Sequence, residues 1–158
     1  MSGWLKCPVH ARHWGVNGAA GLLPFAITPN GVRVLLALRS EGTHQGGTWS
    51  TIGGAIDQGE TPWQAAVREA SEEVPGLDLG GALAADSHEY GCVSGWSYTT
   101  FVVPLPSDAP VTIGHGWATW ETAELRWVPI EEVEQYSLLP ALALTWPELK
   151  KLIEAAAG

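Results

Sequence analysis

The apolar positions of the chain form short runs that are separated by turn-forming residues. Residues 22–28 and 32–38 are two such runs, and Pro29-Asn30-Gly31 lies between them. Aliphatic and β-branched runs joined by this kind of turn are typical of paired strands. A second pair is predicted over residues 87–93 and 97–103, where aromatic and β-branched residues are frequent. Three prolines are expected to end the second pair: Pro104, Pro106 and Pro110.

A helical period replaces the strand pattern after residue 60. Thr61 is a good N-cap, Pro62 suits the first helical position, and Gln64 completes a capping box with Thr61. We therefore expect a helix over residues 62–74, about thirteen residues long. The apolar stripe expected to face the core consists of Trp63, Val67, Ala70 and Val74.

The remaining elements mix both types. Residues 124–130 are predicted to form a strand, 131–134 a helical turn, and 140–157 a helix that is interrupted or restarted near Pro147. The Gly-rich polar segment 40–60 is expected to be a loop with a short strand around residues 49–52, and loops of this length are usually functional. Hairpins on both sides of a single central helix favour an α/β sandwich with a mixed sheet over a doubly wound parallel fold.

Composition limits the possible functions. The chain has 158 residues, of which 46% are apolar and 16% charged, as expected for one folded domain. A net charge of −9, from 17 acidic and 8 basic residues, leaves no broad basic surface for long nucleic acid. A small anionic substrate would need cations, or a few well-placed arginines and lysines, to offset this charge. No apolar stretch or basic leader indicates a membrane or exported protein, so we expect a cytoplasmic one.

Three glutamates, Glu69, Glu72 and Glu73, gather late in the predicted helix, and Arg68 is the only basic residue among them. At 100° per residue they occupy one face of about 100°. Neighbouring like charges repel, and carboxylates late in a helix oppose its dipole. Such a cluster is either a solvated acidic face or a site for a hard divalent cation such as Mg²⁺, which prefers oxygen ligands. The preceding Gly53-Gly54, whose carbonyls can approach an ion closely, favours the second interpretation.

The segment "GAIDQGETPWQAAVREASEEVPG", residues 54–76, resembles the Nudix box. Six positions agree with that motif: Gly54, Glu60, Arg68, Glu69, Glu72 and Glu73. Two features differ: Pro75 replaces the motif's final glycine, and Thr51-Ile52 replaces the usual Leu-Pro. Segments at 13–23, 44–49, 96–103 and 123–133 are also similar to MutT-type Nudix hydrolases, especially an actinobacterial subgroup acting on oxidised guanine nucleotides.

This resemblance implies a Nudix-type α/β/α sandwich around a mixed sheet over residues 13–158, with residues 1–12 as an extension. It implies hydrolysis of a nucleoside diphosphate linked to another group X, such as 8-oxo-dGTP or 8-oxo-dGDP, with Mg²⁺ or Mn²⁺. The implied metal ligands are Glu69, Glu72, Glu73, the Gly54 carbonyl and the more distant Glu121. One of these three glutamates would help to deprotonate the attacking water, with Glu69 and Glu72 as the catalytic candidates. Arg68 and Glu60 would orient the helix and its carboxylates.

Further candidates lie outside the box. Glu124 is the alternative to Glu121, and His115 is a weaker candidate for base or phosphate contact. Arg39 and His44 are proposed to contact phosphate, and residues 136–140, including Tyr136 and Leu139, to contribute to the base pocket. Two other functions stay open: hydrolysis of ADP-ribose or a nucleotide sugar, and a non-catalytic nucleotide-sensing domain. A homodimer is also possible.

Overall fold

The computed structural model describes residues 4–5, 13–14, 17–43, 45–77, 79, 81–91, 95–111 and 122–158. The main sheet has seven strands, β3 (Ala19–Thr28), β4 (Gly31–Arg39), β5 (Trp49–Ser50), β6 (Ile52–Ala55), β7 (Asp86–Gly91), β8 (Ser97–Leu105) and β9 (Thr122–Pro129). The helices are α1 (Pro62–Glu73), the 3-10 helix η2 (Ile130–Gln135) and α2 (Pro140–Ala157). The segments β1 (Trp4–Leu5) and β2 (His13–Trp14) pair separately.

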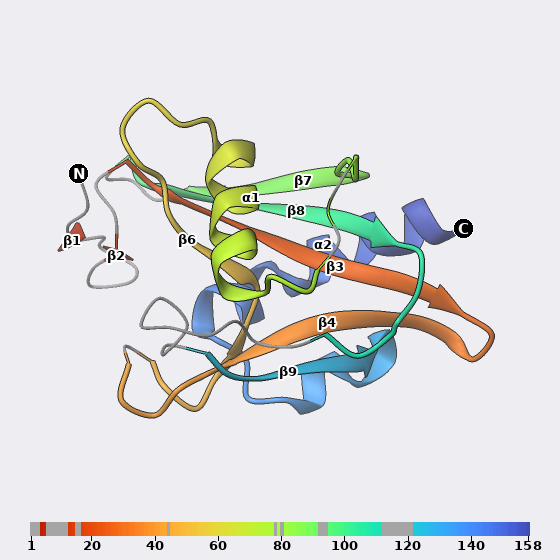
Figure 1. Ribbon diagram of the computed structural model, residues 1–158. Coiled ribbons are helices and arrows are strands. Elements are labelled where there is room, and N and C mark those ends of the chain that lie inside the picture. The colour runs from red at the N-terminus through yellow and green to blue at the C-terminus, as the bar shows by residue number, and fades with distance from the viewer. Residues whose placement is uncertain are drawn as a thin grey trace.

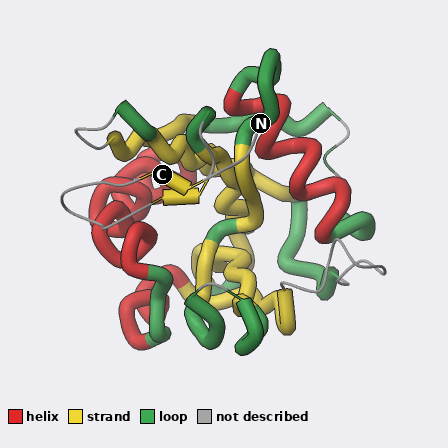
Figure 2. Tube along the Cα trace, turned by 90° about the vertical axis from the view of Figure 1, so that its left-hand side faces the viewer, coloured by secondary structure: helices red, strands yellow, loops and turns green. Residues whose placement is uncertain are grey.

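The sheet is mixed and lies between the helices. Its order is β5-β4-β3-β8-β7, with β6 paired to β3 and β9 paired to β4. Within the described residues β3 and β8 run parallel, and the other neighbouring strands run antiparallel. Helix α1 lies on one face, and α2 lies on the other with η2 nearby (Figures 1 and 2). The predicted α/β/α sandwich with a central mixed sheet is therefore confirmed.

Strand β3 connects the two halves of the sheet. Its C-terminal part forms the predicted hairpin with β4, in which Phe25 pairs with Val34 and Thr28 pairs with Gly31. Its N-terminal part pairs instead with β6, from Ala19 to Leu22. The chain therefore pairs with β4 through β5 and then with β3 through β6. This change of pairing partner brings β6 beside α1, which packs on both β3 and β6.

Two apolar clusters fill the faces of the sheet, because successive side chains of a strand point to opposite sides. Leu22 packs in the cluster under α1, with the buried alanines of that helix. Leu23, its neighbour, packs in the cluster under α2, together with Trp146 and Leu149. The alternation along β3 therefore divides the core between the two helices.

Helix α1 begins as the sequence predicts, but its buried face differs. Thr61 accepts a hydrogen bond from the Gln64 amide at 3.1 Å and the Gln64 side chain accepts one from the Thr61 amide at 3.0 Å, so the capping box is present. The predicted stripe is only partly right, because Trp63 and Val67 are half-buried. The buried residues of the helix are Ala65, Ala66, Ala70 and Glu73. Small side chains allow the helix to lie close to β3 and β6, which rotates the buried face towards Glu73.

Two prolines that were expected to end elements lie inside them. Strand β8 continues through Pro104 to Leu105, and α2 continues through Pro147, contrary to both expectations. Pro147 and Ala143, whose carbonyl loses its helical donor, are both exposed, so this carbonyl can bond to water. Buried Trp146 and Leu149 hold α2 on the sheet on either side of the proline. No helix among the described residues is long and apolar enough to cross a membrane.

Candidate active site

Arg68 connects α1 to the loop before it. Its Nε and Nη2 donate to the two carboxylate oxygens of Glu60, at 2.8 and 3.0 Å, in a bidentate pair. Nη2 also donates to the Ala55 carbonyl at 3.1 Å, and Nη1 donates to Glu69 at 3.1 Å. Asp57, at 3.5 Å, and Glu72, at 3.6 Å, complete the charge cluster around this guanidinium. One cation thus fixes the end of β6, the loop and the acidic helix relative to one another.

The loop is shaped to present Glu60 to Arg68. The Glu60 amide donates to the Asp57 carbonyl at 3.0 Å, the Asp57 amide donates to the Glu60 carboxylate at 2.9 Å, and Gly59 supplies a φ of +86°. The hydrogen bond with Arg68 lowers the pKa of Glu60 below its usual 4.5, with a further lowering from the Asp57 amide. The same hydrogen bond raises the pKa of Arg68 above its ordinary value. Both groups therefore stay charged at neutral pH.

The two glycines of β6 allow close packing, Gly54 against α1 and Gly53 against β3. A Cβ on Gly54 would lie 2.7 Å from the carboxylate carbon and one oxygen of Glu69. A Cβ on Gly53 would collide with the Ala20 carbonyl and the Gly21 Cα of β3. The Glu69 carboxylate therefore lies directly against the Gly54 backbone, in a space that any other residue would fill.

The three clustered glutamates have different surroundings. The Glu69 side chain is 19% exposed and held by Arg68, the Glu72 side chain is 46% exposed, and Glu73 is buried. At about 100° per residue Glu73 lies only about 20° from Ala66 around the helix, which explains its burial. Among the described residues no three His, Cys, Asp or Glu side chains are already gathered as a metal site. The carboxylates share one end of α1 without converging on one point.

Pro75 does not disturb the last turn of α1. The helix extends to Glu73, and the Val74 amide donates to the Ala70 carbonyl at 2.8 Å. Val74 is fully buried, and the Leu77 amide donates to the Val74 carbonyl at 3.0 Å. Burial of Glu73 and Val74 thus holds the end of the helix, directly before the proline that replaces the motif's glycine.

A hydroxyl pair lies on the other face of the same part of the sheet. Tyr98 Oη and Thr51 Oγ1 share a hydrogen bond of 2.6 Å. Burial raises the pKa of Tyr98 to about 12, partly offset by the hydrogen bond with Thr51. The charges of Glu73 and Glu69 raise this pKa further, and Arg39 lowers it. Arg39, Glu69 and Glu73 therefore all contribute to the electrostatics of this hydroxyl.

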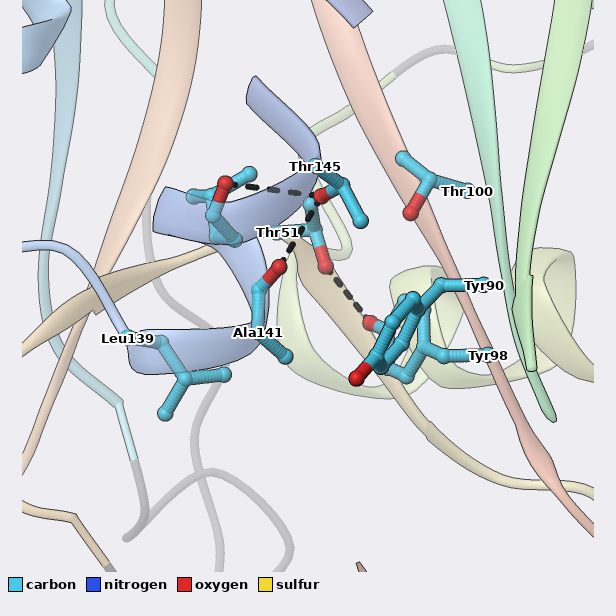
Figure 3. A pocket seen from close by; sticks show the side chains of 8 residues that line it. Thr51, Tyr90, Tyr98, Thr100, Leu139, Ala141 and Thr145 are labelled. Carbon is cyan, nitrogen blue, oxygen red and sulfur yellow. Dashed lines mark hydrogen bonds between the residues drawn. The ribbon is translucent and has the colours of Figure 1, made fainter. Parts of the chain in front are cut away.

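A small cavity of about 20 Å³ adjoins this pair, between the sheet and the start of α2 (Figure 3). Its lining combines aromatic, aliphatic and hydroxyl side chains: Thr51, Tyr90, Tyr98, Thr100, Leu139, Ala141, Leu142 and Thr145. The Thr145 hydroxyl donates to the Ala141 carbonyl at 3.0 Å, so it is satisfied within α2. The cavity holds about one water molecule and would have to widen before a nucleobase could enter.

Of the predicted residues outside the Nudix-like segment, one lines the cavity and others lie apart from it. Leu139 lines the cavity, whereas Tyr136 packs edge-on against Trp49 and has the Arg126 guanidinium 5.8 Å from its ring centroid. Glu124 accepts a hydrogen bond from Arg126 at 2.8 Å. Three predicted residues lie outside the described part of the chain: His44, His115 and Glu121.

Arg39 and the hydroxyl residues add to the site in different ways. The Arg39 backbone closes the loop after β4, donating to Thr48 and accepting from Gly47, at 2.9 Å each. The sequence pattern does not indicate that Tyr98 and Thr51 lie beside the candidate site. The strand propensity around Tyr98 was visible, but the partner of its hydroxyl lies 47 residues away. No local signal could have indicated that contact.

Comparisons with known proteins agree on one family. The NUDIX domain model matches residues 22–154. A Mycobacterium tuberculosis protein named "Putative 8-oxo-dGTP diphosphatase 3" is 41% identical over 154 residues, covering 94% of this chain and 68% of its own. A Bifidobacterium longum protein named as a nucleoside triphosphate pyrophosphatase/Nudix hydrolase fusion is 31% identical, and this chain spans 32% of it. The crystal structure of RenU, a Nudix hydrolase from M. smegmatis, is 37% identical with a TM-score of 0.82, covering 97% of this chain and 95% of RenU.

We expect Arg68→Lys to destabilise the fold. A lysine cannot reproduce the bidentate pair with Glu60 while also contacting Glu69 and Ala55. The free energy of unfolding in urea should fall by about 1–3 kcal/mol, as for lost hydrogen bonds to charged groups. Arg33→Lys is the matched control, because Arg33 makes a 3.6 Å ion pair with Asp108 near the surface. This substitution should change stability by less than about 1 kcal/mol. Equal effects of the two substitutions would contradict the central role of Arg68.

The Glu60–Arg68 pair should also make stability depend on pH. Because the folded-state pKa of Glu60 is lowered, its contribution is complete above about pH 4.5 and is lost as the pH falls through the folded value. The difference in unfolding free energy between the wild type and Glu60→Gln should therefore shrink on acidification. Urea unfolding from neutral pH to about pH 3 measures it. Glu154→Gln, on the exposed face of α2, is the control, and a Glu60 difference that stayed constant with pH would refute the ionic origin.

Proposed function

The chain belongs to the Nudix hydrolase family and is a hydrolase, and from this premise we propose that it hydrolyses an oxidised guanine nucleotide such as 8-oxo-dGTP. General nucleotide pyrophosphohydrolase activity follows from the family. The observation that carries the proposal is the Arg68 network, which fixes Glu69 against Gly54. The 41% identity to the mycobacterial protein named for 8-oxo-dGTP supports the substrate. A cytoplasmic location would give the protein access to the nucleotide pool.

Nudix hydrolases generally need divalent metal ions, and the residues of this chain fit such a cation. The donors at the end of α1 and on β6 are hard oxygens: the carboxylates of Glu69, Glu72 and Glu73 and the Gly54 carbonyl. The Glu69 carboxylate lies beside the Gly54 backbone, in a space that a Cβ would fill. Mg²⁺ keeps several waters, so it does not require three side chains gathered in advance. A bound cation would offset the negative charge of the site and of the substrate phosphates.

In the proposed reaction the oxygen of a water molecule bonds to a phosphorus atom of the substrate. One P–O bond of the phosphoric anhydride breaks, and the nucleotide leaves with fewer phosphates. We assign Glu72 as the proton acceptor, since its side chain is the most exposed of the three and can reach an incoming water. Arg68 and Glu60 would keep α1 in place during the reaction, and Arg39 would contact phosphate. Glu121 and His44 keep their predicted roles as metal ligand and phosphate contact.

The nucleoside is proposed to enter beside the cavity at the start of α2. Aromatic rings of Tyr90 and Tyr98 and the aliphatic Leu139 and Leu142 line it, and such side chains suit a planar base. The small volume means that the segment bearing Leu139 must shift when a base binds. Tyr136, which packs against Trp49, would contribute to the base site by supporting this segment. A homodimer stays a prediction.

We expect Glu72→Gln to lower kcat by about 10²–10⁴, the usual contribution of a general base. Glutamine has nearly the same shape but cannot accept the proton, so circular dichroism and thermal unfolding should remain close to wild type. The matched control is Glu154→Gln, an exposed glutamate on α2, which should turn over normally. Wild-type kcat in Glu72→Gln would exclude this assignment.

A substrate panel tests the proposed specificity. With Mg²⁺, kcat/KM for 8-oxo-dGTP should exceed that for dGTP by about tenfold or more, as expected when one group on a base is recognised. 8-oxo-dGDP, ADP-ribose and nucleotide sugars complete the panel. Excess chelator should abolish phosphate release, and continued release would reject the metal requirement. Preference for ADP-ribose or a nucleotide sugar would replace the proposed substrate, and no turnover of any compound would overturn the proposal.

A further inference from the structure

Thr51 is the residue at which the chain passes from one half of the sheet to the other. Before it, Ser50 pairs with Ala37 of β4, and after it, Ile52 pairs with Leu22 of β3. Thr51 itself belongs to neither strand and is buried. The placement of β6, and with it the Gly54 carbonyl, therefore depends on what holds Thr51.

Tyr98 holds Thr51 from across the sheet. It belongs to β8, which is separated from β6 by β3, and its hydroxyl reaches Thr51 Oγ1 at 2.6 Å. Gly21 of β3 makes this contact possible, because a Cβ there would collide with the Tyr98 hydroxyl and lie 2.7 Å from Thr51 Oγ1. Figure 3 shows the two hydroxyls facing each other. Three strands are thus connected by one hydrogen bond over a backbone that carries no side chain.

The backbone beneath this hydrogen bond consists largely of glycine and therefore carries few side chains. Gly21 pairs with Gly53, and Gly54 follows in β6. Glycine in a strand leaves the backbone freer than other residues do, and an aromatic ring on a neighbouring strand can restore order. On the opposite face Gly54 supports the Glu69 carboxylate. The Tyr98–Thr51 pair and the carboxylates therefore lie on the two sides of one glycine patch, formed by Gly21, Gly53 and Gly54.

Electrostatics agree with this closeness. The charges of Glu73 and Glu69 both raise the pKa of the Tyr98 hydroxyl, and the charge of Arg39 lowers it. These charges belong to α1 and β4, whereas the hydroxyl faces the cavity under α2.

We propose that Tyr98 is a positioning residue, whose hydrogen bond to Thr51 fixes β6 and thereby the glycine backbone that lies beside Glu69 in the cation site. This inference rests on the proposed function, since it takes the end of α1 and the neighbouring β6 backbone as a metal site. Tyr98 need not touch the reacting phosphate. It acts through Thr51 and the three glycines, and it stiffens a stretch of backbone that carries no side chains.

The test measures Mn²⁺ binding without nucleotide, by electron paramagnetic resonance, in Tyr98→Phe and Thr51→Val. Each substitution removes one hydroxyl and keeps the bulk, and each should weaken Mn²⁺ binding by about three- to tenfold, the usual range for one hydrogen bond. The double variant should be no weaker than either single one, because both remove the same interaction. Amide hydrogen exchange over residues 52–55 should become faster in all three proteins.

Two controls separate positioning from general stability. Thr28→Val removes a 2.7 Å hydrogen bond to the Gly31 carbonyl at the far end of β3 and should leave Mn²⁺ binding and exchange in β6 unchanged. Thr51→Ser keeps the hydroxyl and should restore binding, which keeps the test decisive if Tyr98→Phe does not fold. Unchanged Mn²⁺ binding and unchanged exchange in Tyr98→Phe and Thr51→Val would overturn the inference. If the wild type binds no Mn²⁺ and cleaves no nucleotide, the proposed function fails. Faster exchange in β6 of Tyr98→Phe and Thr51→Val would still show that the Tyr98–Thr51 hydrogen bond fixes β6.

Discussion

The rest of the site depends on one partly exposed guanidinium. Arg68 is surrounded by the carboxylates of Asp57, Glu60, Glu69 and Glu72, and it also bonds the Ala55 carbonyl at the end of β6. The chain has a net charge of −9, and four of its carboxylates surround this one guanidinium. Planar geometry allows the guanidinium to bond to loop, strand and helix at once, which an ammonium group cannot do. The acidic helix end is thereby held in place although its own charges repel.

The glycines of β3 and β6 are the second constraint, and they work together with Arg68. Gly54 allows the Glu69 carboxylate to contact the sheet, and Gly21 allows the Tyr98 hydroxyl to reach Thr51 from the other face. Close approach from both sides is possible only where no Cβ intervenes. The cost is a freer backbone, which the strand pairing, the Arg68–Ala55 bond and the tyrosine ring limit. The same few glycines therefore serve both the packing of the sheet and the candidate site.

Much of the fold could be predicted because its signals are local. The capping box of Thr61 and Gln64, the turn at Gly31 and the apolar runs each specify a neighbouring element. Prediction failed where distant burial outweighed a local rule. Pro147 lies inside α2 because buried residues on both sides hold the helix on the sheet. The buried face of α1 follows its alanines rather than its largest side chains, because small residues permit the closest packing against β6.

The sequence by itself determined the chemistry of the candidate site: the carboxylates, the arginine and the glycines, at spacings that one helix and one loop arrange locally. Only the tertiary structure decided how these residues divide their roles. It buries Glu73, leaves Glu72 exposed and turns Glu69 towards Arg68. It also brings Tyr98 to Thr51, which is 47 residues distant. Burial and cross-strand contacts depend on how the sheet pairs and how closely the helix lies on it, and local spacing contains neither.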